Sequence, residues 1–205
     1  MKNDILKDEG SVLVSDRTIT LDELKNNGLS KSAITRAVQK GELVRVGRGL
    51  YHNNTSDTDV DTLLDDEMFS LGSRFKKLIY SHDTSLYLHD LNERDPLKYS
   101  VTVPRGYKTS KLIDEGLSVF SVNKEMYHEH IVEVETMYGN YVRTYSIERT
   151  LCDCLRHIDR LQSEIVLSAL KRYVRRNDRD LLTLSEIAKQ LKVDKLLKTY
   201  LEVLV

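Results

Sequence analysis

Arg45 and Arg48 alternate with two glycines in the stretch RVGRGLY, residues 45–51. Glycines between short apolar stretches are typical of a tight β-hairpin, because glycine adopts the backbone angles that such turns need. Arginines near the tip of a hairpin stand out into solvent, where a guanidinium group binds phosphate or carboxylate oxygens. The chemistry of this stretch is therefore the binding of an anion, and the elements before it must indicate which anion.

The segment SKSAITRAVQKG, residues 30–41, has two different faces at helical spacing. One half of the predicted helix is apolar and consists of Ala33, Ile34, Ala37 and Val38. The other half has no acidic side chain and consists of Lys31, Ser32, Thr35, Arg36, Gln39 and Lys40. A solvated helix face usually mixes both signs of charge, whereas a helix in the major groove of DNA avoids carboxylates and contacts base edges through Arg, Gln, Ser and Thr. This face therefore predicts DNA recognition.

A second short helix is expected just before this one, over residues 20–28. Thr20 is its predicted cap, Glu23 completes a capping box, and Gly28 ends it. Only residues 28–30 separate the two predicted helices. Such a short joint containing glycine is typical of a helix-turn-helix, and the hairpin would be its β-wing. The DNA contacts predicted for this winged helix-turn-helix are Ser30, Lys31, Ser32, Thr35, Arg36, Gln39, Lys40, Arg45 and Arg48. The alternative is a hairpin that closes a small domain and carries arginines for solubility.

The polar segment HNNTSDTDVD, residues 52–61, is predicted to be a linker, because it has no apolar periodicity and is rich in turn formers. It divides the chain into a DNA-binding domain, 1–55, and a second domain, 60–205. Residues 2–9 are predicted to form a further helix at the N-terminus. In the second domain we expect helices within 59–75 and 81–91, strands at 98–104 and 116–123, a hairpin over 130–146, and helices from 147 onward. The predicted fold class is therefore α+β, an N-terminal winged helix-turn-helix followed by a mixed α/β domain with a helical C-terminal part.

Catalytic and metal-binding patterns are sparse. The sequence has no glycine-rich phosphate loop and no His/Cys set at metal-ligand spacing. His82 and His89 are seven residues apart on one predicted helix face, which is too far for one ion, so we interpret them as packing or capping residues. Cys152 and Cys154 point to nearly opposite sides of a predicted helix and are interpreted as buried core residues. No catalytic residue, metal or cofactor is predicted.

A basic stretch near the C-terminus is the second candidate surface. In LKRYVRRNDR, residues 170–179, one face of the predicted helix gathers Lys171, Arg172, Arg175 and Arg176, with Arg179 just beyond. Such a face suits nucleic acid or an acidic partner, and the alternative is an ordinary solvated face. The net charge of the whole chain is only −1, but its positive charge is concentrated in this stretch and in residues 28–52. No apolar run approaches the ~20 residues that span a bilayer, and a cytoplasmic location is expected.

Four stretches in a fixed order carry a resemblance to a known family. They are GELVRVGRGLY at 41–51, YSHDTSLYLHDL at 80–91, YSVTVPRGY at 99–107 and SIERTLCDCLRH at 146–157. Over nearly the entire length, this arrangement resembles the AbiEi-type antitoxins of bacterial abortive-infection toxin–antitoxin systems (type IV), which defend against phage. Many winged helices share the hairpin stretch, so the element at 146–153 carries most of the specificity. Within it, Glu148, Arg149 and Asp153 are expected to form a structural ion-pair network.

The resemblance implies a protein with two roles and no enzymatic activity. The N-terminal domain would bind inverted repeats in the promoter of its own operon and repress it. The second domain would supply most of the antitoxic activity against a nucleotidyltransferase-like toxin, and no stable complex with the toxin is required. The basic residues Lys171, Arg172, Arg175, Arg176 and Arg179 are the candidates for that activity. Two alternatives stay open: a ligand-responsive transcriptional regulator without an antitoxin role, and an enzyme that modifies the toxin or its target.

The expected assembly state rests on the charge of the DNA-binding domain and on its lack of a dimerisation pattern. The predicted DNA-binding domain has nine basic and seven acidic side chains, so its non-specific affinity for DNA should be low and paired sites should matter. No heptad pattern suggests a dimerisation helix. We therefore expect a monomer in solution that pairs on double-stranded promoter DNA.

Overall fold

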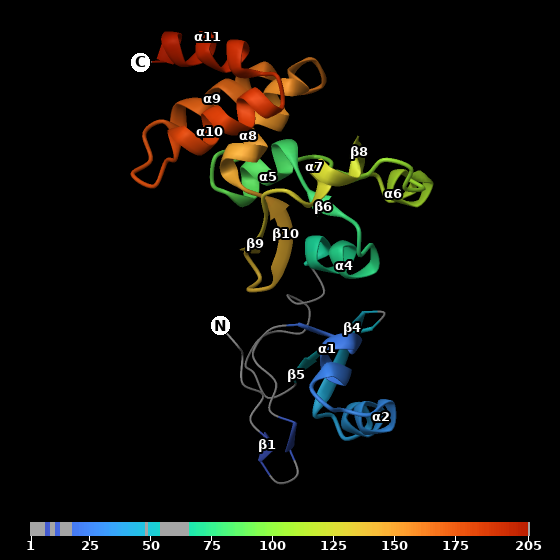
Figure 1. The fold of residues 1–205 in the computed structure, drawn as a ribbon. Coiled ribbons are helices and arrows are strands. Elements are labelled where there is room, and N and C mark those ends of the chain that lie inside the picture. Colours follow the sequence, from blue (N-terminus) through green and yellow to red (C-terminus); the bar gives the residue numbers. More distant parts are fainter. Residues whose placement is uncertain (1–6, 9–10, 13–17, 48, 54–65, 205) are drawn as a thin grey trace. The chain divides into compact units, whose positions relative to one another are not determined.

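The structure is a computed structural model, which describes residues 7–8, 11–12, 18–47, 49–53 and 66–204 (Figure 1). The chain forms two compact units. Unit 1 contains Met1–Lys76 and Glu135–Tyr141, and unit 2 contains Lys77–Val134 and Val142–Val205. Helices and strands occur in both units, so the mixed α+β class predicted from the sequence is confirmed. The division differs from the predicted domains, 1–55 and 60–205, because residues 66–76 and the turn at 135–141 both belong to unit 1.

Unit 1 contains two short helices followed by a hairpin. Helices α1 (Leu21–Asn26) and α2 (Lys31–Gln39) precede strands β4 (Leu43–Gly47) and β5 (Leu50–Asn53). Strand β3 (Ile19–Thr20) completes an antiparallel sheet of order β3-β5-β4. Buried Leu24, Ile34 and Leu43 form the core between the helices and the sheet. This core holds α2 by its apolar side and leaves the opposite side to solvent.

The helix boundaries in unit 1 follow the predicted caps. The Thr20 hydroxyl accepts a hydrogen bond from the Glu23 backbone N–H, and the Glu23 carboxylate accepts one from the Thr20 backbone N–H at 2.8 Å. The Ser30 hydroxyl accepts a hydrogen bond from the Ala33 N–H at 3.2 Å. Gly28 and Gly41, which follow the two helices, have φ angles of 87° and 74°, a region in which a side chain would be strained.

Two predictions near the N-terminus are wrong. Lys7–Asp8 is a strand, β1, paired antiparallel with β2 (Ser11–Val12), so the helix predicted over 2–9 does not include these residues; the rest of that range lies outside the described residues. His52 and Asn53, placed in the linker by the sequence, are the buried end of β5. The sequence did not predict this end of the strand, because the alternation of apolar and polar side chains that indicates a strand stops at Tyr51. Residues 54–61 of the predicted linker lie outside the described residues.

A buried polar network joins distant segments of unit 1. Helix α4 (Glu67–Arg74) is capped by Asp66, whose Oδ1 accepts from the Phe69 N–H at 2.9 Å. The other oxygen, Oδ2, accepts from the Thr136 hydroxyl at 2.6 Å and from the Asn140 side-chain amide at 2.8 Å. Asn140 in turn accepts a hydrogen bond from the Thr18 N–H at 3.0 Å. These bonds explain why the turn at 135–141 belongs to unit 1.

Unit 2 is built on a five-stranded sheet of order β8-β7-β6-β10-β9. Its strands are β6 (Ile79–Tyr80), β7 (Ser100–Pro104), β8 (Ser118–Val122), β9 (Ile131–Glu135) and β10 (Tyr141–Tyr145), the last two reaching into the turn of unit 1. β7 and β8 are parallel and are connected through α6 (Ser110–Asp114), while α7 (Lys124–His128) follows β8. The strands and the hairpin predicted for this region are confirmed.

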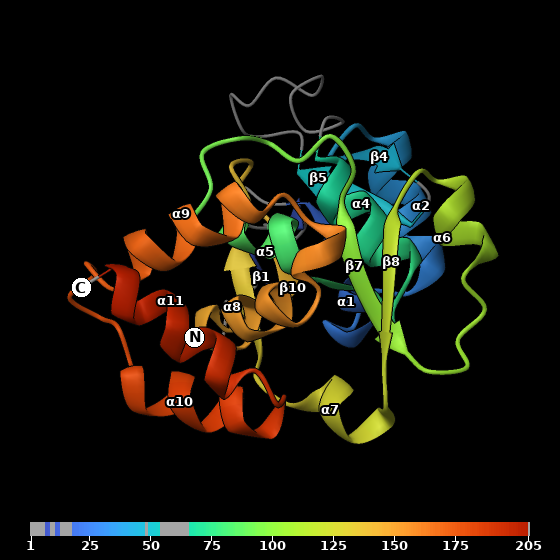
Figure 2. The ribbon, with the colours of Figure 1, turned by 90° about the horizontal axis from the view of Figure 1, so that it is seen from above.

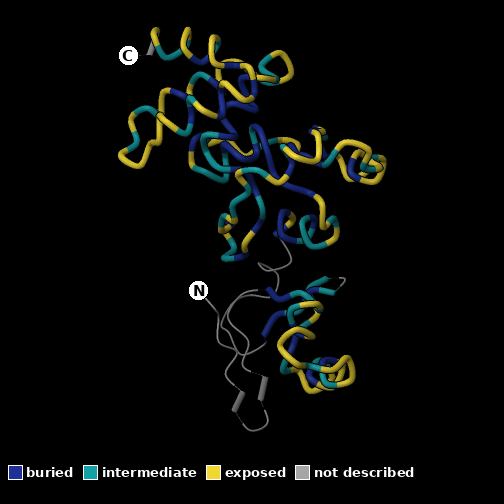
Figure 3. Tube along the Cα trace, viewed as in Figure 1, coloured by how far each residue is buried: buried dark blue, intermediate teal, exposed yellow. Residues whose placement is uncertain are grey.

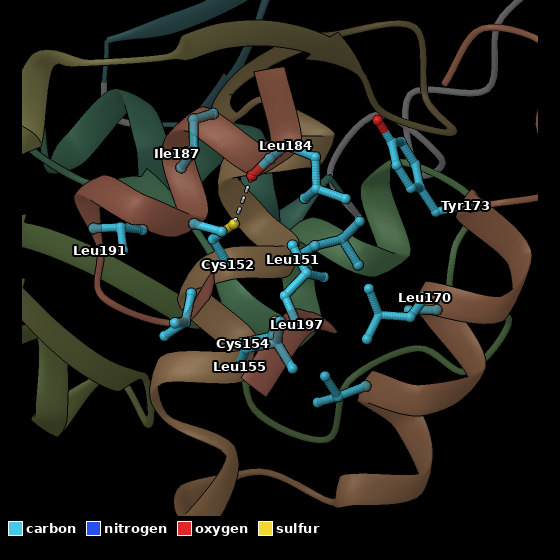
Figure 4. Packing of buried hydrophobic residues seen from close by; sticks show 14 of the residues in the cluster. Leu151, Cys152, Cys154, Leu155, Leu170, Tyr173, Leu184, Ile187, Leu191 and Leu197 are labelled. Atoms are coloured by element: carbon cyan, nitrogen blue, oxygen red, sulfur yellow. Dashed lines mark hydrogen bonds between the residues drawn. The ribbon is translucent and has the colours of Figure 1, made fainter. Parts of the chain in front are cut away.

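The remaining helices make the main core of unit 2. They are α5 (His82–Leu88), α8 (Ile147–Arg156), the short 3₁₀ helix η1 (Ile158–Arg160), α9 (Ser163–Tyr173), α10 (Leu181–Gln190) and α11 (Asp194–Leu204). Figure 2 shows α9, α10 and α11 on the same side of unit 2 as α8, which they contact. Their side chains meet around Leu151, Leu170, Leu184 and Leu197 (Figure 4). No helix in the described part of the chain is long and apolar enough to cross a membrane.

Candidate nucleic-acid interface

The outer face of α2 is the part of unit 1 that the sequence predicted for DNA. Its six polar residues are all exposed: Lys31, Ser32, Thr35, Arg36, Gln39 and Lys40. On the opposite side Ile34 and Ala37 are buried, with 2 % and 3 % of their surface exposed. Figure 3 shows that this helix has both exposed and buried stretches. The amphipathic division read from the sequence is therefore present in the structure, and the exposed side of the helix contains no carboxylate.

The short side chains at the start of α2 are partly used within the helix. The Ser30 and Ser32 hydroxyls lie 2.9 Å apart, and the Thr35 hydroxyl donates to the Lys31 carbonyl at 3.0 Å. The Ser32 and Thr35 hydroxyl oxygens each keep a lone pair for a further donor, whereas Ser30 already accepts from the Ala33 N–H. Arg36 and Gln39, in contrast, are exposed, and their side chains have no hydrogen-bonding partner among the described residues. These two long side chains are therefore free to contact another molecule.

The hairpin β4–β5 lies beside α2 in chain order and has one described arginine. Arg45 is exposed, and its Nε donates to the Gly47 carbonyl at 3.1 Å, which holds the side chain along the strand. The pairing of β4 with β5 shifts between Arg45 and Gly47, as in a β-bulge. The Leu21 N–H donates to the Gly49 carbonyl at 2.7 Å and ties the hairpin to α1. Arg48, the other predicted wing contact, lies outside the described residues.

One ion pair weakens the positive charge at the end of α2. The Lys40 ammonium lies 3.7 Å from the carboxylate of Glu42, and both side chains are open to solvent. Such a surface pair contributes little to stability, since water and salt screen it. Lys40 is therefore available to exchange its partner for a phosphate, and Lys31, Arg36 and Arg45 have no acidic partner among the described residues.

The basic stretch at 171–179 differs from the predicted single helix face. Helix α9 ends at Tyr173, so only Lys171 and Arg172 belong to it, and Arg175, Arg176 and Arg179 follow in the connection to α10. The Tyr173 hydroxyl donates to Glu148 at 2.8 Å and accepts from the Asp180 N–H at 2.8 Å. These bonds, together with the Asp180 cap of α10, make the chain turn where the helical pattern predicted continuation.

Several cations of this stretch already have partners. Arg172 pairs with Glu93 at 2.7 Å, and Arg176 forms two hydrogen bonds of 2.8 Å with Asp178. The guanidinium of Arg176 lowers the pKa of Asp178 to about 2. Arg179 donates to the carbonyl of Arg176 at 2.7 Å. Lys171 and Arg175 are exposed and have no partner among the described residues, so the free positive charge here is smaller than the sequence suggested.

The histidines and cysteines singled out in the sequence lie in unit 2, where His82, Cys152 and Cys154 are buried and His89 is partly buried. The His89 Nε2 lies 2.7 Å from the Tyr145 carbonyl, and the His82 ring stacks on Phe120 at 3.5 Å between centroids. Cys152 and Cys154 are fully buried, and burial raises the pKa of the Cys152 thiol to about 12. All four are packing residues, as we interpreted them, and the buried thiols stay protonated and unreactive.

The predicted ion-pair network of α8 is present in part. The Arg149 Nε donates to Asp153 Oδ2 at 2.9 Å, with both side chains buried, whereas Glu148 accepts from the Tyr173 hydroxyl instead of joining the pair. The polar network around Asp66 was missed by the sequence prediction. The only part of this network with a sequence signal is Asp66, which lies directly before an apolar helical stretch, at a cap position.

His82 gives a pH-dependent contribution to stability. Burial, assisted by the nearby charges of His157, Arg160 and Arg149, holds the pKa of His82 well below its ordinary value of 6.5. Above that value both folded and unfolded chains carry a neutral imidazole, and below it only the unfolded chain takes up the proton. We therefore expect the free energy of unfolding to fall on going from pH 7 to pH 5.5, by about 1 kcal/mol for this residue.

The variant His82→Asn tests this expectation, because asparagine also tolerates the φ angle of 53° found at this position. Urea unfolding of wild type and variant at pH 7 and pH 5.5 should show a smaller loss of stability on acidification in the variant. The matched control is His128→Asn, since His128 is exposed on α7. Equal pH dependence in wild type and His82→Asn would contradict a buried neutral His82.

One comparison with known proteins matches a family over the segment that contains α2 and the hairpin. Residues 14–53 match the model of a family described as "Transcriptional regulator, AbiEi antitoxin". The resemblance to AbiEi antitoxins is thus confirmed for this segment. It spans α1, α2 and the hairpin, the part of unit 1 that holds the acid-free face.

The other comparisons are less informative. No curated protein matches the chain. Among solved structures, the crystal structure of the RV2827C protein from Mycobacterium tuberculosis matches with 11 % identity and a TM-score of 0.38, covering 91 % of this chain and 76 % of that one. A likeness of this size carries no argument about function, so the functional proposal depends on the segment 14–53 and on the geometry of α2.

Proposed function

We propose that this protein is a DNA-binding transcriptional regulator that represses its own operon and also acts as an antitoxin against a nucleotidyltransferase-like toxin encoded beside it. The observation that supports the proposal most is the exposed, acid-free face of α2 within the segment that matches AbiEi regulators. In this proposal α1 and α2 are a helix-turn-helix and β4–β5 is its wing. The protein works in the cytoplasm, as a monomer that pairs on inverted repeats, and needs no catalytic step.

The geometry of α2 suits the major groove. A helix that enters the groove presents one face to base edges and its ends to the phosphates on either side. Arg36 and Gln39, which are exposed and free, would contact base edges, where arginine pairs with guanine and glutamine with adenine. Lys31 and Lys40 lie at the two ends of the helix and would contact phosphates. Arg45 on the wing would contact the backbone next to the groove.

Binding of the full-length protein to the DNA upstream of its gene tests the regulatory half. Fluorescence anisotropy should show tighter binding to this duplex than to a shuffled duplex of the same composition. The affinity should fall with rising salt, because each phosphate contact releases about one counterion. An operator in which one half-site is mutated should bind the protein more weakly than the intact operator does. Equal affinity for the two duplexes at all salt concentrations would contradict a sequence-specific regulator.

Rescue of growth tests the antitoxin half. Cells that express the neighbouring gene should stop growing, and expression of the full-length protein should restore their growth. The variant Lys171→Ala/Arg175→Ala removes the two free cations of the basic stretch without touching an ion pair. Loss of rescue with this variant would locate the antitoxic surface there. Operator binding without any rescue by the wild type would favour a plain regulator.

A further inference from the structure

Unit 2 contains a cavity that no part of the proposed function uses. Its volume is about 420 Å³, within the range of small-molecule sites in proteins. Residues from α5, the segment 92–98, the starts of β7 and β8, and the beginning of α9 line it. Leu86, Ile165 and Val166 give it apolar walls. A cavity with such walls takes a flat or apolar group, and its polar groups decide which one.

Asp83 supplies the less exposed of the two carboxylates that line this cavity. Asp83 is half-buried, and its Oδ1 accepts from the Thr84 N–H at 3.0 Å. Burial raises the pKa of Asp83, and hydrogen bonds from the Ser100 side chain and the Thr84 backbone oppose the rise. No cation pairs with this carboxylate among the described residues. A carboxylate that is partly withdrawn from water and has no counter-charge is best stabilised by N–H donors, which a ligand can supply.

Cations outnumber acids among the other charged groups of the cavity. Arg94, Lys98 and Arg160 line it together with Asp95, and all four are exposed. The Arg160 guanidinium is held over the Phe120 ring, 4.1 Å from its centroid. Two of the five N–H groups of an arginine are enough for a phosphate, so this fixed guanidinium still offers donors. The cavity therefore combines one half-buried carboxylate with an excess of positive charge among its exposed residues.

We infer that this cavity binds a guanine nucleotide. The guanine base offers two parallel N–H donors, from N1 and from the 2-amino group, and these match the two oxygens of a carboxylate. The apolar walls would hold the faces of the base, with the 2-amino and N1 edge on Asp83. The phosphate would lie among Arg94, Lys98 and Arg160. Adenine is disfavoured, because its N1 is an acceptor that would face the carboxylate.

Titration calorimetry with the full-length protein tests this inference using GMP, IMP and AMP. IMP lacks the 2-amino group and should bind ~10-fold more weakly than GMP, since one charge-assisted hydrogen bond is lost. AMP should bind ~100-fold more weakly, because the carboxylate meets an acceptor. Asp83→Asn should remove the preference for GMP over AMP, while Asp114→Asn, at an exposed carboxylate on α6, should leave it unchanged.

The stability of Asp83→Asn and the binding of guanosine to Lys98→Ala complete the test. In the Asp83→Asn variant the new amide oxygen can still accept from the Thr84 N–H, so the thermal unfolding of this variant should resemble that of wild type. Lys98→Ala should weaken the binding of GMP but not of guanosine, which has no phosphate. No binding of GMP, equal binding of the three nucleotides, or an unchanged preference in a folded Asp83→Asn variant would each overturn the inference.

Discussion

Replacing Arg149 with leucine should lower the free energy of unfolding by about 3–5 kcal/mol, the usual cost of breaking a buried ion pair. Only 1 % of the surface of Arg149 and 2 % of that of Asp153 are exposed. The guanidinium donates to Asp153 at 2.9 Å and to the Met126 carbonyl at 3.1 Å, and it lies over the Tyr145 ring. Without it, Asp153 would be a buried charge with no partner.

The cost arises from the acid that is left behind. Burial already raises the pKa of Asp153, and Arg149 opposes this rise. In Arg149→Leu the pKa of Asp153 should rise further, so the variant should recover part of its stability as the pH falls and the carboxyl group becomes protonated. The pKa of Asp153 is then higher in the folded than in the unfolded chain. By linkage, such a group stabilises the folded protein at low pH, and this contribution is lost as the pH rises.

The double variant Arg149→Leu/Asp153→Leu separates the pair from its parts. Arg149 Nη2 and Asp153 Oδ1 have no hydrogen-bonding partner among the described residues, so the pair is not fully satisfied. Removing both charges should therefore cost less than removing Arg149 alone. Urea unfolding followed by circular dichroism measures all three proteins. A double variant as unstable as the single one would show that packing of the arginine, rather than its charge, is what matters.

The local elements of this chain could be predicted because their causes are local. The Thr20 and Ser30 caps, the glycines after α1 and α2, and the alternation along β7 each depend on a few neighbouring residues. The buried side of α2 was also predicted correctly for Ile34, Ala37 and Val38, which are in the core or pack against it. The exposed face, and with it the candidate interface, could therefore be read from periodicity alone.

Features that depend on contacts between distant segments could not be predicted. Asp66 is about 70 residues from Thr136 and Asn140 along the chain, and no pattern of one sequence shows that their side chains meet. The end of α9 at Tyr173 depends on Glu148 and Asp180 in the same way. Ion pairs with Glu93 and Asp178 also reduce the free positive charge of the basic stretch at 171–179, which looked uniform in the sequence. A charge pattern therefore predicts an exposed charged face well only where all of its residues lie on one helix.

Arg36→Ala should weaken binding to the operator by about 10- to 100-fold, the loss expected for an arginine that contacts a guanine. The residue is exposed on the acid-free face of α2 and has no partner to lose within the described part of the protein, so stability should not change. Lys25→Ala is the matched control, because it removes the same charge from the exposed side of α1. Anisotropy titrations at one salt concentration compare the two variants.

Arg36→Lys then distinguishes base contact from phosphate contact. Lysine keeps the charge but lacks the planar pair of donors that matches guanine, so it should restore little affinity if Arg36 reads a base. It should restore most of the affinity if Arg36 binds a phosphate, and the discrimination against a shuffled duplex should then be unchanged. Rescue from the toxin should persist in both variants, since the antitoxic role is proposed for unit 2. An Arg36→Ala variant no weaker than Lys25→Ala would mean that α2 does not face the DNA.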